Sequence, residues 1–192
     1  MKIGVLAVQG AFIEHEFVLE KLGVAAVEVR VPEALKDIDG LIIPGGESTT
    51  ISKLMREFKL TPKILARVKR GMPVMGTCAG MILLAKEVPD GAIEPLRLMD
   101  ICVRRNAFGR QVDSFEASLP VAELGEKPFP CVFIRAPVVE EVGRGVQVLA
   151  RLDGGMCVAA RQGNLLALAF HPELTQDTRF HEYFLDIVAD SQ

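Results

Sequence analysis

The chain has 192 residues, of which 49% are hydrophobic and 24% are charged, a balance typical of a folded globular protein. Its net charge of −3 and isoelectric point near 5.7 offer no basic surface, so we expect no nucleic-acid partner. No apolar run reaches the roughly 18 residues of a membrane span, so we expect no membrane partner. The apolar start is interrupted by Gln9 and no cleavage site follows, so we interpret it as a strand and expect a cytoplasmic protein.

Strand and helix patterns alternate along the first half of the chain. We expect strands at residues 2–8, 24–30, 40–46 and 73–78, and helices at residues 12–22, 51–58, 61–71 and 79–88. The second half is richer in strand patterns, at residues 98–104, 112–119, 131–136, 146–152, 156–162 and 165–170, and an amphipathic helix from Thr178 to Ala189 closes the chain.

This alternation predicts an α/β fold made of three layers. A mostly parallel central sheet would carry helices on both faces, and the later strands would add an antiparallel extension. No repeat, linker or change of composition marks a boundary, so we expect residues 1–192 to form a single domain. Ligands of such folds bind at the carboxyl ends of the parallel strands. The loops that begin at Gln9, Pro44 and Gly76 should therefore converge on one face.

Three of the four cysteines have the surroundings of small core residues. Cys102, Cys131 and Cys157 lie in apolar stretches, and the sequence has no CxxC and no close pairing of cysteine with histidine. We therefore expect neither a metal nor a redox pair, and no cofactor is indicated.

Cys78 has a different setting, because it joins a strand to a helix and has only small neighbours in the sequence GTCAG. A helix N-terminus favours a thiolate, and flanking glycines allow a substrate to approach closely. This arrangement resembles a nucleophile elbow. A crowded contact between a helix and a strand would explain the same residues equally well.

Of the three histidines, His171 is the best candidate for a general base. It ends the apolar stretch LLALAF and is followed by Pro172 and Glu173. Residues i and i+2 of an extended segment point to the same side, so Glu173 could orient the imidazole of His171. His15 lies between two glutamates and His181 lies in the last helix, so we expect a surface position for His15 and a packing or capping role for His181.

The glycine-rich sequence PGGES could complete such a site. Consecutive glycines present free N–H groups at a strand end, and the N–H of Ala79 follows the nucleophile directly. Phosphate binding is a weaker interpretation, because the lysine and the spacing of a P-loop are absent.

These motifs resemble those of class I, triad-type glutamine amidotransferases. The blocks VQGAFIEH, LIIPGGESTTI, GTCAGMILLAK, RRNAFGRQVDSFE, VFIRAP and FHPELTQD are more narrowly similar to the glutaminase subunits of pyridoxal 5'-phosphate synthase. The blocks run in the family's order from residue 8 to residue 177. RNAFGRQ together with GGESTT is the most specific part of the resemblance.

The resemblance implies a glutaminase with a Cys78–His171–Glu173 triad that forms a glutamyl thioester and releases ammonia. It assigns the oxyanion hole to the N–H groups of Gly46 and Ala79. The residues that it implies for glutamine binding are Gly46, Glu47, Ser48, Arg105, Ile134 and Arg135.

The family also implies a partner, a (β/α)₈ synthase subunit that receives the ammonia and makes pyridoxal 5'-phosphate. Gln9 and Gly10 are candidates for coupling the two subunits, and a simple turn role would explain them as well. Three other functions stay open. They are a glutaminase for another synthase such as the imidazole glycerol phosphate enzyme, a cysteine hydrolase on a related fold, and a non-catalytic binding subunit.

Overall fold

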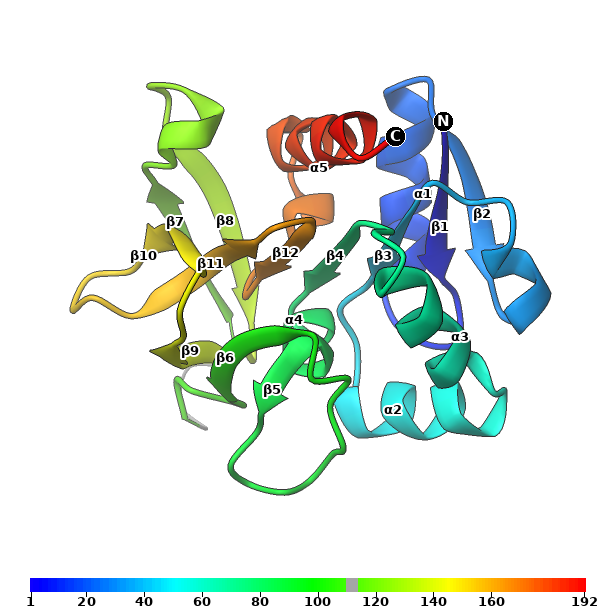
Figure 1. Cartoon of the computed structure of the whole chain (residues 1–192). Helices are drawn as coiled ribbons and strands as arrows, with labels where there is room; N and C mark the ends of the chain where they lie inside the picture. Colours follow the sequence, from blue (N-terminus) through cyan, green and yellow to red (C-terminus); the bar gives the residue numbers. More distant parts are fainter. Residues whose placement is uncertain (110–113) are drawn as a thin grey trace.

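The computed structural model describes residues 1–109 and 114–192. Its main sheet has the strand order β2-β1-β3-β4-β12-β11-β9-β6-β5, and β10 pairs with β11 at one side of this path (Figure 1). The strands of this sheet are β1 (Lys2–Leu6), β2 (Ala25–Val29), β3 (Gly40–Ile43), β4 (Val74–Thr77), β5 (Ala85–Glu87), β6 (Met99–Arg104), β9 (Val138–Val142), β10 (Gln147–Arg151), β11 (Cys157–Gln162) and β12 (Leu165–Leu168).

The five strands from β2 to β12 in this order are all parallel, whereas β12, β11, β9 and β6 pair in antiparallel fashion. A separate two-stranded antiparallel sheet consists of β7 (Ser114–Leu119) and β8 (Phe129–Ile134). Because β1, β3, β4 and β12 are parallel, the loops that follow them meet at one edge of the sheet.

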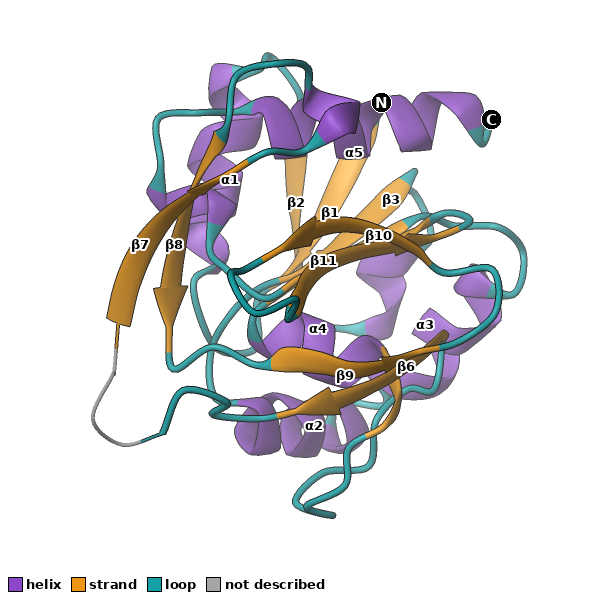
Figure 2. Ribbon diagram, turned by 90° about the vertical axis from the view of Figure 1, so that its left-hand side faces the viewer, coloured by secondary structure: helices purple, strands orange, loops and turns teal. Residues whose placement is uncertain are grey.

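Helices cover both faces of the parallel strands, as Figure 2 shows from the side. One face carries α1 (Phe12–Lys21) and α5 (Arg179–Asp190), and the other carries α2 (Ser48–Glu57), α3 (Leu60–Val68) and α4 (Ala79–Leu84). Three short 3₁₀ turns complete the elements, at Pro32–Leu35, Ala122–Leu124 and Pro172–Leu174. Among the described residues, no helix has the length and apolar character needed to cross a membrane.

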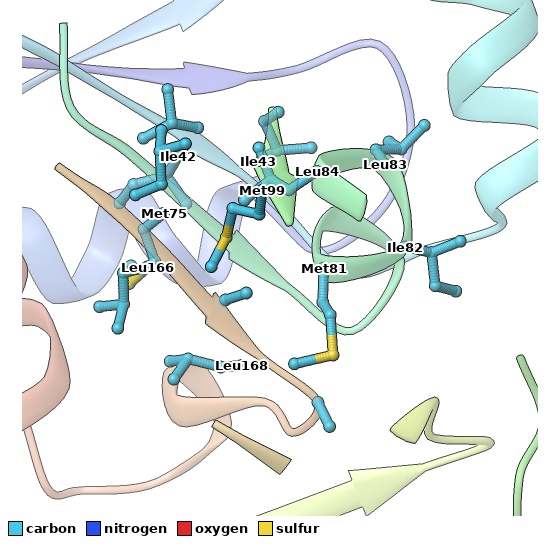
Figure 3. Packing of buried hydrophobic residues seen from close by; sticks show 14 of the residues in the cluster. Ile42, Ile43, Met75, Met81, Ile82, Leu83, Leu84, Met99, Leu166 and Leu168 are labelled. Atoms are coloured by element: carbon cyan, nitrogen blue, oxygen red, sulfur yellow. The ribbon is translucent and has the colours of Figure 1, made fainter. Parts of the chain in front are cut away.

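Helix α4 packs with its backbone directly against the strands, and this contact fixes the position of the start of the helix. Every residue of α4 is buried, and Figure 3 shows Met81 and Leu84 among side chains of β3, β4 and β12. A Cβ added at Gly80 would lie 2.1 Å from the carbonyl oxygen of Ile43, and one added at Gly76 would lie 2.5 Å from the backbone of Gly80. Only glycine permits this approach of backbone to backbone.

The expected fold class is confirmed, and the differences are local. The helix expected at residues 79–88 ends at Leu84, and β5 follows it directly. Strand β9 was not expected, because Val138–Val142 has two buried residues followed by three exposed ones and so lacks a strand alternation. Of the expected strand at 112–119, residues 112 and 113 lie outside the described residues, as do residues 110–113 of the motif RRNAFGRQVDSFE.

Candidate active site

Cys78 occupies the corner between β4 and α4 in a strained backbone conformation. Its φ of 49° and ψ of −102° are unusual for a residue with a side chain. The backbone N–H of Cys78 donates to the carbonyl of Leu168 at 2.8 Å, which ties the corner to the end of β12. The residue is only 7% exposed, and its Sγ lies 3.8 Å from the carbonyl oxygen of Ile134. Persistent strain at one buried thiol is typical of a functional position.

His171 and Glu173 lie beside this corner, and their side chains form a hydrogen bond with each other. The His171 Nδ1 donates to Glu173 Oε1 at 2.7 Å, and both side chains are buried. The expected pairing at i and i+2 is therefore present, but its geometry differs from the extended segment that we predicted. Pro172–Leu174 form a 3₁₀ turn that begins after His171, and the turn brings the carboxylate back onto the ring.

The ring of His171 is held between its two neighbours. Burial alone would lower the pKa of His171, but hydrogen bonds to Cys78 and Glu173 and the charge of Glu173 raise that pKa to about 10. A Cβ added at Gly45 would lie 2.3 Å from His171 Cε1 and 3.3 Å from Cys78 Cβ. The cysteine, the imidazole and the loop after β3 therefore meet at one point.

The loop after β1 clamps the loop after β3. The N–H of Ala11 donates to the carbonyl of Gly45 at 2.9 Å, and the N–H of Glu47 donates to Gln9 Oε1 at 2.9 Å. Gly10 has a φ of 104°, and a Cβ there would lie 2.0 Å from the oxygen of Gly45. The predicted convergence of the loops is thus confirmed by their contacts.

A cavity of about 370 Å³ opens beside Cys78 and His171. All six residues that the resemblance implies for glutamine binding contribute to its lining, which consists of Gly46, Glu47, Ser48, Cys78, Ile82, Arg105, Asn106, Ile134, Arg135 and His171. The sequence reasoning missed Ile82 and Asn106. This volume suits a small ligand such as a free amino acid.

The guanidinium of Arg105 is fixed from two sides. Its Nη1 donates to Ser48 Oγ at 3.2 Å, and its Nε lies 3.1 Å from Asp90 Oδ2. Arg105 is mostly buried, so a positive charge is presented at the cavity in a defined position. Asp90 was not a candidate, because its approach to Arg105 depends on the folding of the long loop between β5 and β6.

The carboxylate of Glu47 caps helix α2. It accepts hydrogen bonds from the backbone N–H groups of Thr49 and Thr50 and from both hydroxyl groups. Burial raises the pKa of Glu47, but these hydrogen bonds outweigh burial and lower that pKa to about 2. Glu47 therefore has two structural roles: it fixes the conformation of the loop and it lines the cavity.

The surface position expected for His15 was wrong, whereas His181 does have a packing role. Both side chains are fully buried between α1, α5 and the sheet, where His15 Nδ1 lies 2.9 Å from His181 Nε2. The signal was present in the sequence, because His15 shares one helix face with the buried Val18 and Leu19. The glutamates on both sides of His15 in the sequence had instead indicated a polar, exposed segment.

The other cysteines fit their expected structural role. Cys131 and Cys157 are buried, and Cys102 is partly buried. Burial raises the pKa of Cys131 to about 12 and also raises the pKa values of Cys102 and Cys157. Such thiols stay protonated and unreactive near neutral pH.

The parallel sheet brings Cys78, His171 and Glu173 together at its carboxyl edge, and solved structures with the same fold indicate the class of the protein. A solved structure described as a glutamine amidotransferase superimposes with a TM-score of 0.90, at 52% identity, over 97% of this chain and 98% of that chain. The structure of PurLQS from Thermotoga maritima has a TM-score of 0.69 at 16% identity, over 96% of this chain and 97% of that chain, and shares the fold alone.

The SNO glutamine amidotransferase family matches residues 5–190, and the chain belongs to this family. A relative from Herpetosiphon aurantiacus, called pyridoxal 5'-phosphate synthase subunit PdxT, is 63% identical over 97% of this chain and 100% of its own length. A protein of the same name from Dehalococcoides mccartyi is 60% identical over 97% of each chain. The resemblance expected from the motifs is therefore confirmed.

Proposed function

We propose that the chain is the glutaminase subunit of a pyridoxal 5'-phosphate synthase and hydrolyses L-glutamine to L-glutamate and ammonia. The observation that carries the proposal is the contact of Cys78 with the His171–Glu173 pair at the cavity of about 370 Å³. The names of the relatives from Herpetosiphon and Dehalococcoides support the choice of synthase. One continuous cluster of buried side chains from β1 to α5 supports treating residues 1–192 as a single domain.

The first half of the reaction acylates Cys78. The proton of the thiol is already on His171, as the raised pKa of His171 favours, and Sγ bonds to the side-chain carbonyl carbon of glutamine. When the tetrahedral intermediate collapses, the carbon–nitrogen bond breaks and His171 passes the proton to the leaving nitrogen, which departs as ammonia. Glu173 keeps Nδ1 of the ring protonated and stabilises its cation, so Nε2 is the atom that exchanges protons.

The second half releases glutamate. His171 takes a proton from water, the hydroxide adds to the thioester carbonyl, and the carbon–sulfur bond breaks with return of the proton to Cys78. In both halves an oxyanion forms beside Cys78. We assign its stabilisation to the N–H groups of Gly46 and Ala79, since Ala79 follows the nucleophile and Gly46 lies in the clamped loop.

Glutamine recognition is assigned to the lining of the cavity. Arg105, held by Ser48 and Asp90, would bind the α-carboxylate. Gly46, Glu47, Ile134 and Arg135 would complete the amino-acid site. The carboxylate of Glu47 is engaged as a helix cap, so its part in the site would be to hold the loop and supply local negative charge.

The partner in this proposal is a (β/α)₈ synthase subunit that receives ammonia before water can protonate it. Gln9 and Gly10 would couple docking to catalysis, because they contact Gly45 and Glu47 directly. A reducing compartment such as the cytoplasm is consistent with four cysteines that form no disulfide in the described structure.

The test measures glutamate release from glutamine by the purified chain, alone and with a pyridoxal 5'-phosphate synthase subunit. We expect activity that rises with the synthase and disappears in Cys78→Ala. If the two proteins are folded and associated but release no glutamate, the glutaminase assignment is wrong and a binding subunit is left. If they do not associate while the chain alone is active, only the assigned partner is wrong.

A further inference from the structure

A buried polar cluster lies behind the proposed triad, on the side of Glu173 that faces away from His171. His15 Nε2 lies 3.4 Å from Glu173 Oε2 and 3.2 Å from Thr77 Oγ1. On the other side of its ring, His15 Nδ1 forms a hydrogen bond with His181 Nε2. All four side chains are buried, so bulk water does not reach their polar atoms.

The positions of the protons follow from the two ends of this cluster. In the described part of the chain, Glu173 Oε2 and His181 Nδ1 have no hydrogen-bond partner. If His181 Nε2–H donates to His15 Nδ1, then His15 carries its proton on Nε2, which faces the carboxylate. The opposite choice would aim a nitrogen lone pair at Oε2 and leave a buried N–H of His181 unpaired, which is rare in folded proteins. The donors therefore point from His181 through His15 toward Glu173.

Both histidines are neutral in this arrangement. Burial lowers the pKa of His15, and burial followed by the neighbouring His15 lowers the pKa of His181 to about 3. His15 therefore offers Glu173 an N–H dipole rather than a full charge. A dipole of fixed direction in a dry site still favours the ionised carboxylate.

We infer that His15 is a positioning residue for the triad, that its Nε2–H dipole favours the negative charge on the free oxygen of Glu173 while Oε1 orients His171, and that the hydrogen bond to His181 fixes the tautomer of His15. The inference rests on the proposed glutaminase function. His15 is not among the residues that line the cavity, so it acts through Glu173. Thr77 accepts from the same Nε2–H and precedes Cys78 in the chain, which ties the cluster to the nucleophile corner.

The test compares four variants in the complex with the synthase subunit. His15→Leu removes the donor at similar volume, His15→Gln restores an N–H donor near the Nε2 position, and His181→Leu frees the tautomer of His15. Val18→Ala, one turn further along α1, is the matched control, because it weakens the same buried face without touching Glu173.

We expect His15→Leu to lower kcat by roughly tenfold, which equals about 1.4 kcal/mol of transition-state free energy, with KM for glutamine little changed. His15→Gln should recover most of this loss, and His181→Leu should show a smaller loss. The far-downfield proton resonance of the His171 Nδ1–H should shift in His15→Leu and stay in place in Val18→Ala.

Two results would overturn the inference while the wild-type chain hydrolyses glutamine normally. One is a His15→Leu variant with wild-type kcat and an unchanged His171 resonance. The other is an equal loss of kcat in Val18→Ala, because the effect would then be one of packing. If His15→Leu does not fold, the recovery in His15→Gln and the loss in His181→Leu decide the question. A wild-type complex without glutaminase activity would instead refute the proposed function.

Discussion

Acidification below pH 6.5 is expected to destabilise the fold through two buried histidines, His15 and His181. Burial keeps both rings neutral in the native state, whereas in the unfolded chain each would be protonated near its ordinary pKa of 6.5. Below this pH the unfolded state binds more protons than the native state, so the free energy of unfolding falls as pH falls. Between pH 6.5 and 5 the loss is about 1–2 kcal/mol for His181, whose pKa is lowered to about 3, and His15 adds a loss in the same direction.

The other members of the cluster act outside this pH window. The pKa of His171 is raised to about 10, so His171 is protonated in both states below pH 6.5, and its contribution to stability is lost only as pH rises toward 10. Burial raises the pKa of Glu173, but His15 and His171 lower it below 4.5, so its contribution is lost only below about pH 4.5. Within this cluster, the slope between pH 5 and 6.5 therefore reports on His15 and His181.

The assay is urea unfolding followed by circular dichroism at several pH values from 5 to 6.5. His181→Gln removes one titrating ring, so the slope of unfolding free energy against pH should become smaller. His171→Gln is the control and should leave this slope unchanged. If His181→Gln has the wild-type slope, or if the wild type has none, the buried neutral pair does not exist in solution.

Substitutions at three positions test other parts of the site. Cys78→Gly and Cys78→Ala should both abolish glutamine hydrolysis. In urea the glycine variant should be more stable than the alanine variant by about 1 kcal/mol, because glycine adopts the positive φ of this position without strain. Equal stabilities of the two variants would argue against strain at the corner. Gly10→Ala should lower kcat on the order of 100-fold without unfolding the chain, because its Cβ would displace Gly45; a wild-type rate would mean that this loop is not coupled to catalysis. Arg105→Gln should raise KM for glutamine by about tenfold with kcat nearly constant, since it removes a contact to the substrate carboxylate; an unchanged KM would remove Arg105 from the binding site.

The fold and the grouping of Cys78 with His171 and Glu173 could be predicted because their signals are local in the sequence. The small residues around Cys78 reflect the approach of α4 to β3, and the pairing of His171 with Glu173 needs only a two-residue spacing. The roles assigned to the triad and to the glutamine-binding residues stay predictions until activity is measured.

The contacts that were missed join segments far apart in the chain. His15 meets His181 across 166 positions, and the pairing of Arg105 with Asp90 depends on an irregular loop. The segment from His171 to Glu173 was expected to be extended, because proline favours an extended conformation in the residue before it. This preference does not determine the residues that follow, and Pro172–Leu174 form a 3₁₀ turn.

Strand β12 has a consequence for the order in which the protein can become active. It is the last strand in the sequence, yet it lies between β4 and β11 in the middle of the sheet. Until Leu165–Leu168 have been synthesised, β4 has an unpaired edge and Cys78 lacks the carbonyl of Leu168 that holds its backbone. His171 and Glu173 follow β12 directly. A growing chain therefore carries Cys78 without His171 for about half of its synthesis, from residue 78 to residue 171, and the proposed hydrolysis of glutamine cannot begin until the sheet closes.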